Sequence, residues 1–215
     1  MRGTPVRWLA LVGMLALGGC ASAPSQYLVD YAEPHPTPDH FRVCHGYGCK
    51  LATRVALSAD EWRQVRAAFE PAASTASTER RQIAAAIAIL EVQVGQRTGT
   101  AVHQRREINR GDPSQLDCID ESVNTWTYLT MLAGDGLIRL HRVGGLAHSG
   151  SFVELSVHNA AVIRGITTGT PYAIDSTLVD AGEPPPVLPL EVWLASWPPR
   201  IPGAELQPQA SGNPI

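Results

Sequence analysis

Three residues, Cys118, His158 and Asp175, have side chains that together could break an amide bond. Asp117 precedes Cys118 and predicts a helix N-cap, which places the thiol in the first helical turn. A thiol at a helix N-terminus lies near unpaired N–H groups and the positive end of the helix dipole, and both favour the thiolate. Asp117 and two acidic residues after Cys118 oppose this effect, so a histidine is needed to take the thiol proton.

His158 and Asp175 supply that partner. His158 precedes one predicted strand and Asp175 ends the next, so a hairpin through Thr168-Gly169 would make them cross-strand neighbours. A cysteine that attacks, a histidine that accepts its proton and an aspartate that orients the imidazole form a triad for acyl transfer at an amide. Each residue alone has a plainer explanation, since such a histidine is usually an edge residue and an aspartate before Ser-Thr usually forms a turn. The three together predict a cysteine-dependent enzyme.

The first 20 residues have the organisation of a bacterial export signal. Two arginines precede the apolar run Trp8–Leu17, which is too short to cross a hydrocarbon core of about 30 Å. The run ends in Leu-Gly-Gly-Cys at 17–20, which resembles a lipobox. This resemblance implies removal of a signal peptide, 1–19, and lipidation of Cys20. Because Ala21 follows, it also implies a lipoprotein anchored in the outer membrane and facing the periplasm. An ordinary signal peptide with an incidental Cys20 is the alternative.

Export changes what the remaining cysteines can do, because disulfides form in the periplasm. Cys44 and Cys49 are separated by His-Gly-Tyr-Gly, and the two glycines allow a turn tight enough for a small disulfide loop. Cys118 is then the odd cysteine, which is consistent with a nucleophile. A zinc cluster is the alternative, but its spacing matches no zinc signature, so no metal site is predicted there. Its members would be His35, His40, His45, Cys44 and Cys49.

Composition and local bias define the domain organisation. The 215 residues carry 17 Lys and Arg against 20 Asp and Glu, a formal net charge of -3, so the chain offers no basic surface for nucleic acid. Prolines among mostly polar residues predict a tether over 20–40. We expect the folded domain at 41–200 and a loose tail at 201–215.

Helical periodicity precedes strand periodicity along the chain. Ser58 opens a capping box and predicts one helix, a second is predicted over 79–94 with Gly95 as its C-cap, and a third begins at Cys118. Trp193 is expected to pack the Pro-rich C-terminal part onto the domain. Short β-favouring runs follow the helices, at 137–143, 152–157, 160–164 and 172–174. This order predicts an α+β fold with N-terminal helices followed by an antiparallel sheet.

Three segments resemble a known family. Asp117-Cys118, His158-Asn-Ala-Ala-Val-Ile and Tyr172-Ala-Ile-Asp175-Ser resemble the core of the transglutaminase-like cysteine enzymes, in particular the bacterial transglutaminase-like proteases. The resemblance covers about residues 79–195 and implies a papain-like core. It also implies that Cys118 is the nucleophile, His158 the general base and acid, and Asp175 the orienting residue. Many members have an aromatic residue shortly after the histidine, where this chain has Asn-Ala-Ala, so the family's groove shape does not carry over.

An oxyanion hole would complete such a site. The backbone N–H of Cys118 is the first donor, and Gln115 could add a side-chain amide as a glutamine does in papain-like enzymes. A solvated loop glutamine is the alternative. Some bacterial relatives bind calcium near the nucleophile, and no other cofactor is expected. The acidic residues that could hold calcium, or simply favour a helix N-terminus, are Asp117, Asp120 and Glu121.

These features predict a thiol-dependent acyl-transfer enzyme acting on amide bonds of peptides or proteins in the cell envelope. Hydrolysis by a cysteine peptidase or amidase is the default outcome. Attack of an amine on the acyl-enzyme would instead make a cross-linking transglutaminase. A non-catalytic envelope lipoprotein that binds a peptide or wall fragment on the same fold is the alternative from another class.

Overall fold

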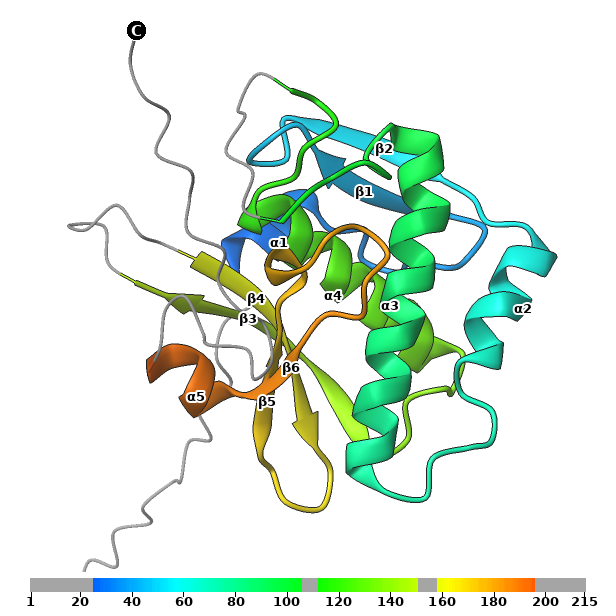
Figure 1. The fold of residues 1–215 in the computed structure, drawn as a ribbon, viewed down its shortest axis with the longest axis vertical. Helices are drawn as coiled ribbons and strands as arrows, with labels where there is room; N and C mark the ends of the chain where they lie inside the picture. The colour runs from blue at the N-terminus through cyan, green and yellow to red at the C-terminus, as the bar shows by residue number, and fades with distance from the viewer. Residues whose placement is uncertain (1–24, 106–111, 151–157, 196–215) are drawn as a thin grey trace, which may run out of the picture.

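Helices and antiparallel strands make up the part of the chain that the computed structural model describes, residues 25–105, 112–150 and 158–195 (Figure 1). The mixture confirms an α+β fold. The elements in chain order are α1 (Gln26–Tyr31), β1 (Phe41–His45), β2 (Leu51–Val55), α2 (Ala59–Ala67), α3 (Ala76–Thr98), α4 (Cys118–Gly134), β3 (His141–Ser149), β4 (His158–Gly165), β5 (Pro171–Ile174), a short 3-10 helix (Ser176–Leu178), β6 (Val187–Pro189) and α5 (Leu190–Ala195). The predicted strand at 152–157 lies outside the described residues.

The strands form two antiparallel sheets. One has the order β3-β4-β5-β6, and the other is the hairpin β1-β2, which the sequence analysis did not predict. The turn between β4 and β5 contains Gly169 with a φ of 70°, a left-handed conformation that glycine adopts readily. The predicted hairpin at 168–169 is therefore confirmed, and it sets the β4/β5 register that pairs Ala161 with Ile174.

Helix α4 is the centre of the structure (Figure 1). It packs against α1, α3, β1, β3 and β4. Its second half buries Tyr128, Leu129 and Leu132 in the main core, where they meet Ile87 of α3 and Ile163 of β4. Because α4 is enclosed on several sides, the residue at its N-terminus is held by the whole fold rather than by one neighbour.

The helices before α4 follow their local signals, with one correction. Ser58 caps α2 in a capping box, as predicted. Helix α3 does not end at Gly95 but continues to Thr98, with Gly99 as its left-handed C-cap. Gly95 is explained by packing instead, because a Cβ there would lie 2.6 Å from the backbone nitrogen of Ala101. The predicted C-cap at Gly95 is therefore wrong.

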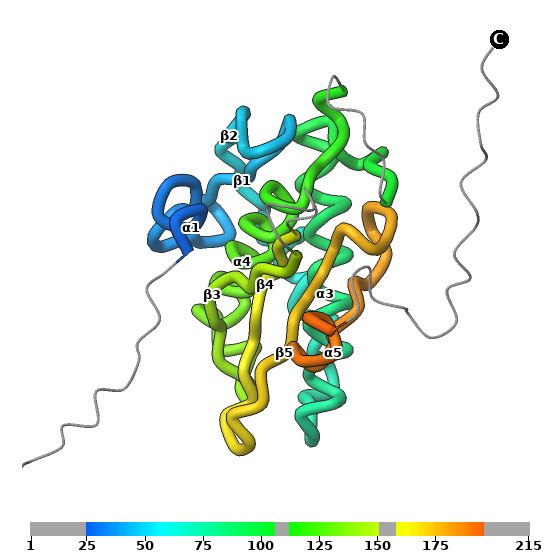
Figure 2. The backbone as a smooth tube through the Cα atoms, turned by 90° about the vertical axis from the view of Figure 1, so that its left-hand side faces the viewer, coloured from blue at the N-terminus to red at the C-terminus, as the bar shows by residue number. Residues whose placement is uncertain are grey.

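Helix α1 lies within the stretch predicted as a tether, 20–40. Its residues Tyr27, Leu28 and Tyr31 pack around Val123 of α4 and the Cys44–Cys49 pair. The apolar residues of this six-residue helix explain why it is packed onto the domain although prolines surround it. Figure 2 shows α1 and α5 on different sides of the β3-β4-β5 strands.

Candidate active site

Cys118 is the first residue of α4, as the sequence predicts. The carboxylate of Asp117 accepts the backbone N–H groups of Ile119 and Asp120, both at 3.0 Å. Asp120 in turn accepts the backbone N–H of Asp117 at 3.2 Å, which completes a capping box. Cys118 is half-buried and lies outside the disulfide. The local sequence alone therefore fixes the thiol at a helix N-terminus.

His158 and Asp175 are joined by a hydrogen bond. His158 Nε2 lies 2.8 Å from Asp175 Oδ2, and both residues are buried, with 5% and 1% exposure. Continuing the β4/β5 register places Asp175 opposite Ala160, so His158 reaches the carboxylate along a diagonal. The hairpin brings the two residues together as predicted, although not as directly opposed neighbours.

The Asp175 carboxylate is held by two further donors. Trp193 Nε1 of α5 donates to Asp175 Oδ2 at 2.8 Å, and Thr177 Oγ1 donates to Oδ1 at 2.6 Å. The Trp193 ring, fully buried, also lies against the His158 ring with centroids 5.7 Å apart. The packing of Trp193 was predicted, but its bond to Asp175 was not. A buried tryptophan indicates that an acceptor lies nearby, because a buried indole N–H requires a hydrogen-bond partner.

The thiol lies beside the start of β4. Asn159 Nδ2 is 3.5 Å from Cys118 Sγ, and Asn159 is the residue next to His158. Burial, together with the negative charge of Asp117, raises the pKa of the Cys118 thiol to about 11, while hydrogen bonds from Asn159 act in the opposite direction. Burial and the neighbouring carboxylates thus outweigh the hydrogen bonds from Asn159, and the thiol needs a base to lose its proton near neutral pH.

The Cys44–Cys49 disulfide is present, as predicted, and its loop is bound to the N-terminus of α4. Residues 46–49 all have positive φ, including the non-glycine residues Tyr47 and Cys49. This turn directs three backbone N–H groups at α4. Those of Tyr47 and Cys49 donate to Asp120 at 2.9 and 2.7 Å, and that of Gly48 donates to Asp117 at 2.8 Å. The loop therefore stabilises the Asp117 and Asp120 carboxylates beside the thiol by hydrogen bonding.

Gln115 is buried just before α4. Its Oε1 lies 3.0 Å from His103 Nδ1 and accepts the backbone N–H of Gln104 at 3.1 Å, while its Nε2 is 3.4 Å from Ser114 Oγ. These contacts tie the 103–104 segment to the entrance of α4. The role of Gln115 as an oxyanion donor stays a prediction.

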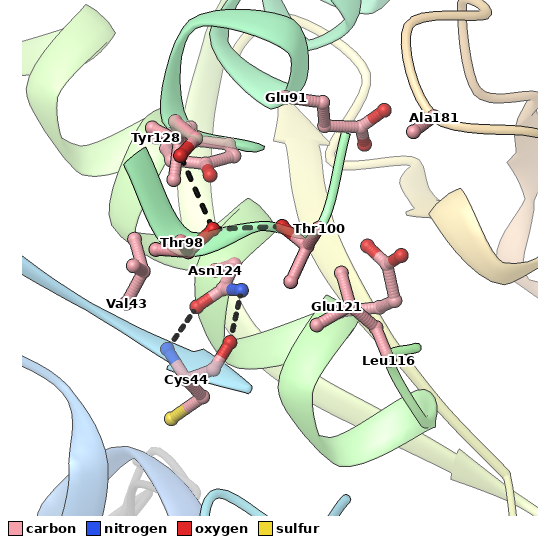
Figure 3. Close-up of a pocket in the computed structure, with 11 residues that line it drawn as sticks. Val43, Cys44, Glu91, Thr98, Thr100, Leu116, Glu121, Asn124, Tyr128 and Ala181 are labelled. Atoms are coloured by element: carbon pink, nitrogen blue, oxygen red, sulfur yellow. Dashed lines mark hydrogen bonds between the residues drawn. The ribbon is translucent and has the colours of Figure 1, made fainter. Parts of the chain in front are cut away.

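A small cavity lies on another side of α4 (Figure 3). Its volume is about 20 Å³, and both Glu91 of α3 and Glu121 of α4 line it. Among the described residues Glu91 Oε1 is buried without a hydrogen bond, and its Oε2 accepts the N–H of Gly182 at 3.3 Å. Glu121 Oε1 lies 3.3 Å from His103 Nε2. Burial raises the pKa of Glu91 to about 7, and burial with the charge of Glu91 raises that of Glu121 well above its usual value.

Among the described residues, the ligand atoms of Asp117, Asp120 and Glu121 are not grouped closely around one point, and calcium binding at the start of α4 stays a prediction. Asp117 and Asp120 direct their oxygens at backbone N–H groups, and Glu121 faces His103. Within the described chain, the ligand atoms that approach one another closely belong to Cys44, Cys49 and Asp120, and the two sulfurs there are bonded to each other.

Comparisons with known proteins find no matching family model, no matching curated protein and no matching solved structure. Within the described residues, no helix combines the length and the apolar character needed to cross a bilayer. The site must therefore be interpreted from its own geometry.

Proposed function

We propose that this chain is a thiol-dependent acyl-transfer enzyme that hydrolyses amide bonds of peptides or proteins in the cell envelope. The observation that carries the proposal is the 2.8 Å hydrogen bond between His158 and Asp175. Asp175 is itself held by Trp193 and Thr177, so the imidazole is fixed in orientation. The Cys118 thiol, at the start of α4, lies 3.5 Å from Nδ2 of Asn159, the neighbour of His158 in β4, and the proposal requires its proton to reach His158. A nucleophile, a base and a group that orients the base are the parts that acyl transfer requires.

In this mechanism Nε2 of His158 faces the carboxylate, so Nδ1 exchanges protons with the reacting groups. The Cys118 Sγ–H proton passes to His158 Nδ1 while Sγ bonds to the carbonyl carbon and the carbonyl electron pair moves to oxygen. The intermediate collapses as the C–N bond breaks, and His158 returns the proton to the leaving amine. Water then attacks the thioester with His158 as base, which releases the acid and the thiol.

The cellular setting is part of the same proposal. The export signal and the lipobox-like 17–20 support a lipoprotein held at the outer membrane through Cys20 and facing the periplasm. The Cys44–Cys49 disulfide supports an oxidising compartment. The order of a cysteine at a helix start, a histidine on one strand and an aspartate after the next supports a papain-like, transglutaminase-like core.

One observation favours a second candidate. The pKa of the Cys118 thiol, raised to about 11, is that of an unreactive cysteine unless a protonated His158 stabilises the thiolate. A protein that retains the triad residues for structure and binds a peptide or wall fragment would have such a thiol.

Labelling with iodoacetamide across pH separates the two candidates. The protein is the full chain carrying Cys20→Ser in a mild detergent, with Cys118→Ser and His158→Ala added singly. For the enzyme, we expect fast labelling confined to Cys118, with a pH midpoint well below 11 that rises in His158→Ala. Replacement of the exposed His35 by alanine is the control and should leave the midpoint unchanged. A midpoint near 11 that does not depend on His158 would favour the binding protein.

A further inference from the structure

A second polar pair reaches the thiol from β3 and β4. His148 and Asn159 lie opposite each other in the β3/β4 register. Asn159 is buried, with 2% exposure, and its Oδ1 is paired with His148 Nδ1. Its Nδ2 is the group 3.5 Å from Cys118 Sγ. An amide whose oxygen is occupied by a histidine N–H must turn its NH2 group the other way, and here that direction is toward the sulfur.

Strand alternation places this pair on a different face from the triad histidine. Along β4, Ala160 packs with Trp193 while Ala161 joins the core that includes α4. His158 shares the face of Ala160, and Asn159 shares the face of Ala161. Two polar residues in succession at the start of an otherwise apolar strand thus serve both faces of the sheet. This was the sequence signal for Asn159, which the sequence analysis treated only as a departure from the family.

We propose that Asn159 is the side-chain donor of the oxyanion hole, with His148 as the residue that orients it. The inference rests on the proposed acyl-transfer function. As the bond from Sγ to the carbonyl carbon forms, the developing oxyanion lies next to the sulfur. A donor already in contact with Sγ can approach this oxyanion to about 2.7–3.1 Å, the distance at which oxyanion donors act.

The surroundings distinguish Asn159 from Gln115 in this role. The carbonyl oxygen of Gln115 accepts the backbone N–H of Gln104 and lies near His103 Nδ1, and its nitrogen is near Ser114 Oγ. The amide of Asn159 touches the reacting atom and is held by its partner across the strands. Because Asn159 is uncharged, it can stabilise negative charge on oxygen without contributing a charge of its own.

Two reactions of Cys118 separate an oxyanion donor from a residue that merely supports the thiol. Acetylation by p-nitrophenyl acetate passes through a tetrahedral oxyanion, whereas alkylation by iodoacetamide does not. In the full chain carrying Cys20→Ser, we expect Asn159→Ala to slow acetylation of Cys118 on the order of 10²-fold, the usual cost of losing one oxyanion donor, and to leave alkylation essentially unchanged. Both products are measured by mass spectrometry on the Cys118 peptide.

His148 is tested as a positioning residue by the same pair of rates. His148→Ala should slow acetylation selectively, and His148→Asn, which keeps an N–H near the position of Nδ1, should restore it. His35→Ala is the control and should change neither rate.

Three results would overturn the inference. Equal loss of acetylation and alkylation in Asn159→Ala would mean that Asn159 supports the thiolate or the local fold. An unchanged acetylation rate would mean that it contributes nothing to the oxyanion. If the parent does not acetylate Cys118 at all, the proposed function fails first and the role of Asn159 fails with it, an outcome distinct from the other two.

Discussion

The buried carboxylate of Glu91 predicts that this protein loses stability as the pH rises through neutrality. Burial beside the cavity in Figure 3 raises the pKa of Glu91 from 4.5 to about 7. The folded protein therefore holds this proton more tightly than the unfolded chain does. The stabilisation is fully present below pH 4.5 and is lost as the pH rises to about 7. At about 1.4 kcal/mol for each pH unit, the contribution of Glu91 is about 3 kcal/mol.

Glu91→Gln removes the titration while keeping the shape and the hydrogen-bonding capacity of the side chain. Urea unfolding, followed by tryptophan fluorescence at pH 4.5 and pH 8, measures the effect. We expect the two proteins to match at pH 4.5 and the variant to be more stable by about 3 kcal/mol at pH 8. Glu91→Gln also removes the charge that helps raise the pKa of Glu121, so the difference between the two pH profiles reports both carboxylates together.

The control is the same substitution at an exposed position, Glu191→Gln in α5, which should leave the pH profile of stability unchanged. Parallel profiles for the parent and Glu91→Gln would refute the reasoning. They would mean that the Glu91 carboxylate contacts water or a partner group in solution, so that burial does not disfavour its ionised form.

Two further substitutions test how the core is held. Glu79 is 1% exposed, and its carboxylate accepts hydrogen bonds from two backbone N–H groups and contacts His141 Nδ1, all at 2.8–3.0 Å. Glu79→Gln should therefore lower the free energy of unfolding by about 2–4 kcal/mol. Urea unfolding at pH 7 measures the loss, and a change below about 0.5 kcal/mol would contradict it. Gly95→Ala should destabilise by about 1–3 kcal/mol although alanine is the better helix former, because its Cβ would meet the Ala101 backbone. Gly134→Ala, with nothing within 4 Å of the new Cβ, is the control, and a gain of stability in Gly95→Ala comparable to that control would refute the packing argument.

The parts of the fold that local chemistry determines could be predicted from the sequence. The capping box at Ser58 and the N-cap at Asp117 predicted the starts of two helices, because a cap bonds to residues within the first helical turn. The hairpin at 168–169 followed from its turn residues. The C-cap at Gly95 failed because glycine serves close packing as well as helix ends, and the two uses look alike in a sequence.

The hairpin β1-β2 was missed for a different reason. Its five-residue strands Phe41–His45 and Leu51–Val55 do not alternate cleanly, since β1 is buried almost throughout and β2 mostly exposed. Periodicity cannot identify strands of this kind. The segment between them predicted only a disulfide loop, and its binding to the carboxylates of Asp117 and Asp120 depends on tertiary structure.

The candidate site, like the fold, was predicted only in part. The residue types and their order along the chain predicted Cys118, His158 and Asp175 as a triad. The structure joins the last two by a hydrogen bond, and the catalytic role of the three stays a prediction. The contacts of Trp193 and Asn159 could not be derived, because they depend on where α5 packs and on which strand face each residue occupies. A sequence specifies such contacts only through the register of the complete sheet.

If Cys20 carries a lipid, as proposed, helix α1 would keep this site close to the membrane. Its Tyr27 ring lies 6.1 Å from that of His148, the partner of Asn159, so the first described helix adjoins the thiol side of the sheet. Five residues lie between Cys20 and Gln26, and the six steps from one to the other span at most about 20 Å. With a lipid on Cys20, the proposed enzyme would be held close to the membrane surface by a short linker. Its substrates would then be confined to the layer of the periplasm next to the bilayer, which makes the length of 20–25 a determinant of which polymers or proteins it can touch.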